Sequence, residues 1–501
     1  MEEIVEKYDI KADGINAEVR IMGGKGILKQ YKIKLMDFSR PTMALLDEIR
    51  HELITEVSVS TTEILDPKSV IHLKQKFQEK ATNLLEKHIP DLSPEKKKYL
   101  SGRLMQEMLG LGKIEFLLND INLEEVVINS VQEPLRVYHK TYGWLLTDLT
   151  VESEAQIQNY ANIIARRVGR QISTLNPLLD AHLVTGDRAN AVLFPVSNKG
   201  NTITIRKFSR DPWTVTDLIK NNTVNSEIMA LIWLAIQYES NILISGGTAS
   251  GKTSLLNICL PFIPPNHRIL TIEDTRELVL PKFLYWCPLV TRQPNPEGKG
   301  EVTMLDLLIN SLRMRPDRII LGEIRKKRDA EVLFEAMHTG HSVYATVHAD
   351  TIFQTIKRLV SPPIEVSPNL LEAVNLNVVM FRDRRTGTRR IYQVGEYEVK
   401  EDALKPDIIP NIMYRLDPNK DKLVPHRPSK RLFEDLSRHT GLSLTELNKD
   451  LAVKKKILEW MVKNNLRKID NVGQVINEYY IDPKHIEQLV NKNKKPKELL
   501  K

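Results

Sequence analysis

The residues of this chain with the clearest chemical potential form a glycine-rich segment, 246–254. It reads Gly-Gly-Thr-Ala-Ser-Gly-Lys-Thr-Ser. Glycines at this spacing let the backbone curl so that successive N–H groups point inward and form an anion nest at a helix N-terminus. Lys252 can then reach β- and γ-phosphates, and the Thr253 hydroxyl can bind Mg²⁺. We therefore expect a nucleotide's phosphates to contact Gly246, Gly247, Thr248, Ala249, Ser250, Gly251, Lys252, Thr253 and Ser254.

The flanking sequence supports this interpretation. A short apolar run, 241–245, precedes the glycine-rich segment, and apolar residues at helical spacing (Leu255, Leu256, Ile258, Leu260) follow it. This strand–loop–helix context is the one in which the pattern binds nucleotides. A glycine-rich turn without a ligand is the alternative.

Ionisable residues stand at the ends of three further predicted strands. Carboxylates at such positions could hold Mg²⁺ and orient a water, because open α/β sheets place ligands at the carboxyl ends of their strands. The run 268–272 precedes Glu273, Asp274 and Glu277, the run 318–321 precedes Glu323, and the run 342–347 lies between His341 and His348.

The histidines could be interpreted in three ways. His338, His341 and His348 could suggest a metal site, but no cysteine lies at ligand spacing and the sequence shows no clear further ligand. Phosphate sensing at a strand end explains them better, and plain structural hydrogen bonding is the third possibility.

Composition limits the class of protein. With 501 residues, 42% hydrophobic and 27% charged, the chain should form two to four globular domains. No apolar run is long enough to span a membrane and the acidic N-terminus does not resemble a secretory signal, so we expect a cytoplasmic protein. The two cysteines fit a reducing compartment. The net charge of +8 permits an acidic partner, either nucleic acid or anionic lipid, or simply aids solubility.

Periodicity divides the chain into segments. Alternating helices and short β-rich runs after Thr214 imply a parallel sheet with crossover helices. The predicted segments are a hairpin with a turn at 23–26 plus helices over 1–110, an α+β domain over 111–207, a linker over 208–215, an α/β domain over 216–398 and a helical C-terminal extension over 399–501.

Four ordered motifs carry a family resemblance. They are Gly-Gly-Thr-Ala-Ser-Gly-Lys-Thr, Thr-Ile-Glu-Asp-Thr-Arg-Glu-Leu, Leu-Gly-Glu-Ile-Arg and Ala-Met-His-Thr-Gly-His-Ser-Val-Tyr-Ala-Thr-Val-His. They resemble the Walker A, Asp-box, Walker B and His-box motifs of the type II/type IV secretion ATPase superfamily. The resemblance covers about residues 115–395. The C-terminal extension and residues 310–317 look closest to the archaeal branch, which powers pili or archaella.

This resemblance implies a fold, a cofactor and an assembly. The α/β domain would be a RecA-like P-loop NTPase core behind an α+β N-terminal domain, with ATP and Mg²⁺ bound between subunits of a homo-hexamer. Arg188 and Arg206 would reach the γ-phosphate of their own or a neighbouring subunit as the domain closes. The implied catalytic residues are Glu323, Glu277, Arg188, Arg206 and His348, and the implied Mg²⁺ ligands are Thr253, Glu273 and Asp274.

Two departures from the family pattern are visible. Lys326 stands where the family often has an aspartate after the Walker B arginine, and Asp329 could supply the missing carboxylate, or that acid could be dispensable. The paired Cys-x-x-Cys elements of many bacterial relatives are absent, so no zinc subdomain is expected.

The leading hypothesis is an ATP-driven motor at the inner face of the cytoplasmic membrane. It would act on a polytopic membrane platform protein to drive assembly of type IV pilus-like filaments or type II-like secretion. Filament extension, retraction, archaellum rotation and export are all open at this stage.

Two other hypotheses compete with the motor. A RecA-like nucleic-acid translocase or DNA-transfer ATPase would use the basic charge and a helix-turn-helix-like segment at 440–447. However, aromatics are only 6% and the lysine clusters lack interleaved stacking residues, so nucleic acid is not favoured. A non-catalytic, nucleotide-gated adaptor is the third hypothesis.

Overall fold

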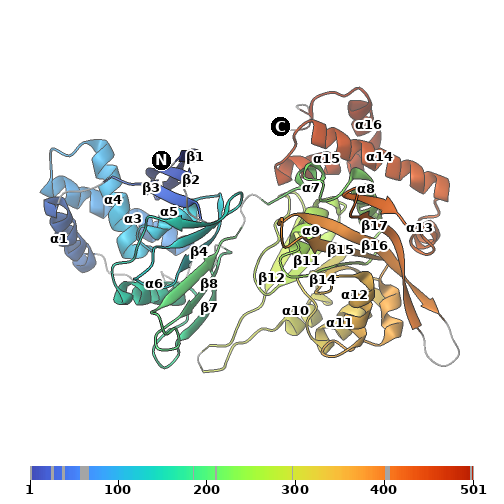
Figure 1. The fold of residues 1–501 in the computed structure, drawn as a ribbon, viewed down its shortest axis with the longest axis horizontal. Helices are drawn as coiled ribbons and strands as arrows, with labels where there is room; N and C mark the ends of the chain where they lie inside the picture. The colour runs from blue at the N-terminus through green and yellow to red at the C-terminus, as the bar shows by residue number, and fades with distance from the viewer. Residues whose placement is uncertain are drawn as a thin grey trace. The chain divides into compact units, whose positions relative to one another are not determined.

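A computed structural model describes residues 3–496 apart from 24–27, 37–39, 57–66, 184–185, 209–211, 296 and 401–406, together with Leu499. The chain forms two compact units (Figure 1). The first comprises Met1–Arg210 and Asn295–Lys299, and the second Asp211–Pro294 and Gly300–Lys501. Each unit is described by itself.

The first unit is built on a nine-stranded sheet with strand order β1-β2-β3-β6-β5-β4-β9-β8-β7. Neighbouring strands are antiparallel except for the parallel pair β3 and β6. The strands are β1 (Glu3–Ala12), β2 (Ile15–Gly23), β3 (Gln30–Lys34), β4 (Leu123–Ile128), β5 (Arg136–His139), β6 (Gly143–Thr147), β7 (Leu178–His182), β8 (Arg188–Val192) and β9 (Thr202–Arg206). The predicted hairpin turn falls partly on 24–27, outside the described residues.

Helices complete this unit. They are α1 (Arg40–Glu56), α3 (Pro67–His88), α4 (Pro94–Leu109), α5 (Ile114–Asn119) and α6 (Glu154–Arg167). Ser93 precedes α4 and Pro94 begins it, a position where the missing proline N–H costs nothing. Helices α1, α3 and α4 share a small apolar core that includes Ile49, Leu53 and Leu85.

A buried aspartate ties the N-terminal strands to the rest of the first sheet. The hydroxyls of Tyr8 (β1) and Tyr31 (β3) both donate to Asp120 Oδ2, at 2.7 and 2.8 Å. Burial, followed by the Asp120 charge, raises the pKa of both phenols far above its usual range. The sequence analysis placed residues 1–110 outside the α+β domain. In the structure, β1–β3 and β4–β9 form one sheet. The sequence did not reveal this pairing because it joins residues far apart in the chain.

The second unit contains another nine-stranded sheet, with order β12-β11-β13-β14-β10-β15-β16-β17-β18. The strands β12, β11, β13, β14, β10 and β15 are parallel to one another. Strands β16, β17 and β18 extend the sheet beyond β15, each antiparallel to its neighbour. The strands are β10 (Ile242–Gly246), β11 (Arg268–Glu273), β12 (Tyr285–Val290), β13 (Arg318–Leu321), β14 (Ser342–Val347), β15 (Leu376–Arg382), β16 (Arg389–Lys400), β17 (Asp407–Asp417) and β18 (Lys422–Pro425). The predicted α/β fold with a parallel sheet is confirmed.

Helices pack on both faces of this sheet (Figure 1). One face carries α8 (Ser226–Gln237), α9 (Lys252–Cys259), α13 (Leu432–Thr440), α14 (Leu444–Lys463), α15 (Ile469–Ile481) and α16 (Pro483–Asn491). The other carries α10 (Met304–Ser311), α11 (Lys327–His338), α12 (Ile352–Val360) and the 3₁₀ helix η2 (Pro368–Ala373). The remaining helices are α7 (Val215–Lys220) and the 3₁₀ helix η1 (Leu260–Phe262). Among the described residues, no helix combines the length and hydropathy needed to cross a membrane.

The C-terminal extension begins differently from the prediction. It contains the strands β17 and β18 before its helices, because β17 pairs along most of β16 and continues the sheet. The helices then pack on α8, the apolar helix that precedes the glycine-rich loop: Trp233 of α8 stacks on Phe262 and meets Tyr479 of α15 edge to face. The helical extension is therefore part of the second unit's core.

A buried carboxylate on β16 anchors the start of this helical region. Glu396 is fully buried and accepts hydrogen bonds from the backbone N–H groups of Lys430, Arg431 and Leu432, and from the side chains of Asn411 and Ser429. Backbone donors at a helix N-terminus have no partner within the helix, so an ionised carboxylate there satisfies them. Glu396 therefore fixes α13 to the sheet.

We expect Glu396→Gln to destabilise the protein by about 2–4 kcal/mol, because an amide NH₂ would face backbone donors and leave them unsatisfied. Glu398→Gln, two residues along the same strand, is the matched control. It loses only a partly exposed ion pair with Lys430 and should cost less than about 1 kcal/mol. Urea unfolding of both variants measures the difference, and equal losses would contradict this role of Glu396.

Candidate nucleotide site

The glycine-rich loop lies between β10 and α9, as the motif requires. Gly251 is the N-cap of α9 with φ +95°, and Ala249 has φ +56°. At Gly246, with φ +156°, an added Cβ would lie 2.6 Å from the carbonyl oxygen of Met380 and 2.5 Å from Ser250 Oγ. Glycine is therefore required where the loop leaves the sheet. The loop also places the first-turn N–H groups of α9 toward a potential anion.

Lys252 is half-buried within the curl of the loop. Its Nζ donates to the carbonyl oxygen of Gly247 at 2.9 Å, and Ser250 Oγ donates to the same oxygen at 2.8 Å. Burial lowers the pKa of Lys252, and the negative charges of Glu323 and Asp350 partly oppose that shift. Lys252 Nζ thus has a backbone carbonyl as its hydrogen-bond partner, and two negative charges act on it.

An arginine connects two of the predicted acids. Arg325 Nη1 lies 2.7 Å from Asp274 Oδ2, and its Nη2 lies 2.7 Å from Glu323 Oε2. Asp274 follows β11 and Glu323 follows β13, which are neighbouring parallel strands. The structure therefore brings together the acids after these two strands at the carboxyl edge of the sheet.

Glu273 differs from the expected arrangement. It is 2% exposed, and its Oε1 accepts the backbone N–H groups of Glu277 and Leu278 at 2.9 and 3.1 Å. Its Oε2 is buried and has no hydrogen-bond partner among the described residues. The carboxylate thus faces the backbone of its own loop, while Glu277 is exposed. Binding of Mg²⁺ by Glu273 stays a prediction, and it would require this loop to rearrange.

The three histidines have separate surroundings. His348 Nε2 lies 2.8 Å from Thr248 Oγ1, so the residue after β14 contacts the glycine-rich loop directly. His338 hydrogen-bonds the carbonyl oxygen of Leu370, and His341 lies near Thr339 and the carbonyl oxygen of Ala336. Among the hydrogen bonds described for these three histidines, that of His348 reaches the glycine-rich loop.

Asp350 belongs to the site although the sequence analysis missed it. A Cβ on Gly247 would lie 2.6 Å from Asp350 Oδ1, and the carboxylate acts on Lys252. The rule that strand ends carry site residues could have found it, since it stands two residues after His348 and just before α12.

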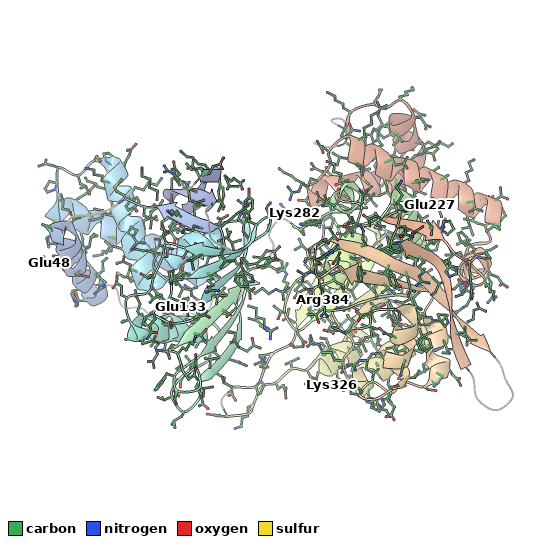
Figure 2. All side chains as sticks on the ribbon, viewed as in Figure 1. Glu48, Glu133, Glu227, Lys282, Lys326 and Arg384 are labelled. Atoms are coloured by element: carbon green, nitrogen blue, oxygen red, sulfur yellow. The ribbon has the colours of Figure 1, made fainter. Side chains whose placement is uncertain are left out.

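Asp329, the proposed substitute for the acid missing at Lys326 (labelled in Figure 2), is buried in the first turn of α11. Burial raises its pKa, and the nearby Asp274 charge adds to the rise.

The two predicted arginines lie in the first unit and are neighbours. Arg188 on β8 is the direct cross-strand partner of Arg206 on β9. Arg188 makes a bidentate contact with Asp180, at 3.0 and 2.7 Å. Hydrogen bonding to Arg188 lowers the pKa of the Asp180 carboxyl. Asp180 thus orients Arg188, while both arginines stay exposed.

Comparison with known proteins gives consistent matches. Residues 179–383 match the family described as "Type II/IV secretion system protein". The chain is 36% identical over 397 residues to an uncharacterized protein of Methanocaldococcus jannaschii, covering 78% of this chain and 71% of the relative. It is 32% identical over 286 residues to the type IV secretion system protein VirB11 of Bartonella henselae, covering 50% and 78%. The solved VirB11 ATPase of the Brucella suis type IV secretion system, in complex with sulphate, is 25% identical, with 56% and 90% covered and a TM-score of 0.29.

The environment of Glu273 predicts a measurable pH dependence. Burial raises its pKa from 4.5 to about 7. Between these two pH values the folded protein keeps a proton that the unfolded chain releases. The stability that the protonated carboxyl contributes is therefore fully present below pH 4.5 and is lost as the pH rises through about 7. Glu273→Gln removes this loss. The unfolding free energy of the variant minus that of the wild type should rise between pH 5 and 8, by on the order of 2 kcal/mol.

Urea unfolding of protein free of nucleotide and Mg²⁺ measures this difference at each pH. Glu277→Gln is the control: it removes an exposed neighbouring carboxylate and keeps the buried one, so the difference from wild type should change with pH much less than for Glu273→Gln. A flat difference for Glu273→Gln would show that the buried carboxyl does not titrate in this range.

Proposed function

This chain belongs to the type II/IV secretion system family of ATPases, and we propose that it is a Mg²⁺-dependent, homo-hexameric motor. Its hydrolysis of ATP would drive assembly of type IV pilus-like filaments or type II-like secretion. It would act at the inner face of the cytoplasmic membrane on a polytopic platform protein.

One observation carries the proposal. Lys252 sits in the glycine-rich loop within the electrostatic reach of two carboxylates, and one of them, Glu323, is bridged through Arg325 to Asp274. A phosphate cradle alone describes a binder, whereas hydrolysis also needs acids that hold the metal and orient a water. The charges of Glu323 and Asp350 act on the lysine of the glycine-rich loop, and this supports the proposal.

The donor set fits Mg²⁺, a hard cation that prefers oxygen ligands in an octahedron and usually keeps several waters. Thr253 in the first turn of α9 and Asp274 after β11 would hold the ion, with Glu273 a further ligand if its loop opens. When bound, Mg²⁺ supplies positive charge to the β- and γ-phosphate oxygens.

The protein's own residues would then divide the work. Lys252 leaves the Gly247 carbonyl to bind the β- and γ-phosphates, and Glu323 orients the attacking water, with Glu277 as a further acid of the same site. His348 would sense the γ-phosphate through Thr248, which it already contacts. Arg188 and Arg206 would stabilise the charge that develops on the transferring phosphoryl group. Asp350 would hold Lys252 until the nucleotide arrives.

The nucleic-acid alternative gains no support from the C-terminal helices. The segment at 440–447 does form a helix–turn–helix, but α14 is packed against α8, and Leu447, Lys454 and Ile457 are buried. A recognition helix must present one face to the major groove. We favour the membrane platform over nucleic acid as the partner because the chain belongs to the secretion family and its lysine clusters lack interleaved aromatic residues.

Lys252→Ala and Glu323→Gln should each lower ATP turnover at least about a hundredfold, because each removes a charge that acts on the transferring phosphoryl group. A steady-state phosphate-release assay with purified protein measures this. Lys326→Ala is the control on the same exposed loop and should keep most of the activity. Turnover that is undiminished in either site variant, with an unchanged melting temperature, would contradict the assignment.

A mixing experiment tests the arginines and the ring together. Arg188→Ala should lower kcat about 10²- to 10³-fold while nucleotide binding persists, since such an arginine acts mainly in the transition state. If Arg188 serves a neighbouring subunit, mixing Arg188→Ala with Lys252→Ala protein should restore activity above the sum of the two. Lys252→Ala mixed with itself is the control. A mixture no more active than its parts would show that Arg188 acts within its own subunit or not at all.

A further inference from the structure

The hairpin between β15 and β16 brings a pair of arginines to the glycine-rich loop. Arg389 Nε donates to the carbonyl oxygen of Ala249 at 3.1 Å. A Cβ on Gly251 would lie 3.4 Å from Arg389 Cδ and 3.5 Å from Met380 Cε, so Arg389 and Met380 approach the loop from the same face of the sheet. Arg382, two residues after Met380 and the direct cross-strand partner of Arg389, shares that face.

These two arginines lack compensating negative charge. Like charges directly opposite each other on antiparallel strands are unfavourable. Arg382 Nε is buried and has no hydrogen-bond partner in the described part of the chain, and neither Arg382 nor Arg389 forms an ion pair there. The nearby acids are committed elsewhere: Asp383 accepts the backbone N–H of Arg385, and Asp421 pairs with Arg390.

Strand order sets which part of a nucleotide the pair would meet. Glu323 and His348 follow β13 and β14, which lie on one side of β10, whereas Arg382 and Arg389 lie on β15 and β16 on the other side. The γ-phosphate belongs with Lys252, Glu323 and His348. A nucleotide that crosses the loop in this direction therefore presents its α-phosphate and nucleoside to the arginine side.

We propose that Arg382 and Arg389 bind the α-phosphate of the bound nucleotide, as a second anion subsite beside the glycine-rich loop. The inference deepens the proposed function and rests on it. Arginine suits this task because its planar guanidinium can donate two parallel hydrogen bonds to phosphate oxygens. The anion would also relieve the repulsion between the two cations. Because ATP and ADP share the α-phosphate, the subsite would hold nucleotide before and after hydrolysis.

The test compares full-length wild type with Arg382→Gln, Arg389→Gln and the double variant. The matched control is Arg384→Gln, on the exposed tip of the same hairpin (Figure 2). It removes the same charge. We measure the Kd for ADP by calorimetry, and KM and kcat for ATP hydrolysis. Each single variant should weaken ADP binding and raise KM by about tenfold or more, and the effect should fall on KM rather than kcat. Arg389→Lys should recover part of the affinity.

The possible outcomes distinguish a failure of the α-phosphate subsite from a failure of the proposed ATPase function. If wild-type protein binds neither ADP nor ATP, the proposed function fails. If wild type binds ADP and the double variant, with an unchanged melting temperature, binds it equally well, the subsite is wrong while the function stands. A loss confined to kcat would place the arginines at the γ-phosphate and overturn the proposal. An equal loss in Arg384→Gln would assign the effect to general charge and overturn it too.

Discussion

The site depends on the tight passage of the backbone from β10 into α9. At Gly246 the chain passes so close to the Met380 carbonyl and the Ser250 hydroxyl that no side chain fits. This approach makes β15 part of the wall of the loop, so the loop's shape depends on a strand more than a hundred residues away. A curl that directs N–H groups at an anion is therefore a property of the whole sheet, and the motif alone does not ensure it.

Buried polar side chains keep the strands in the register that this contact needs. Asn377 on β15 donates to the Leu243 carbonyl and the Ser245 hydroxyl of β10, and Tyr397 on β16 donates back to Asn377. Asn241 extends the same connection to β14 by accepting the N–H of Val343. Because buried polar groups are costly when unsatisfied, a shift of one residue in register would be strongly penalised. The polar network thus aligns the strands whose ends form the site.

The sequence predicted the parts of the fold that are read locally. Hydrophobic runs located β10, β11, β13 and β14. Pairing between distant strands leaves no local signal in a sequence. The sequence therefore did not reveal that β1–β3 belong to the first sheet, or that β17 forms a strand in a region predicted as helical. In the site, spacing predicted roles for Lys252, Glu323 and His348, and these roles stay predictions. It did not predict that the Glu273 carboxylate faces its own loop, because only the folded backbone brings the Glu277 and Leu278 N–H groups to this carboxylate.

The arrangement has a consequence for a motor that must distinguish ATP from ADP. The residues proposed to contact the γ-phosphate follow β13 and β14, and the arginines proposed for the α-phosphate lie on β15 and β16. The two ends of a bound nucleotide would therefore be held from opposite sides of the loop. Hydrolysis changes only the γ end. Contacts at the α end would bind ATP and ADP alike and cannot by themselves drive a conformational change, since a ligand shifts an equilibrium only by its differential affinity for the two states. In the proposed motor, the force-producing step would therefore originate at the groups proposed for the γ-phosphate, Glu323 and His348, and the α-phosphate subsite would retain the nucleotide before and after hydrolysis.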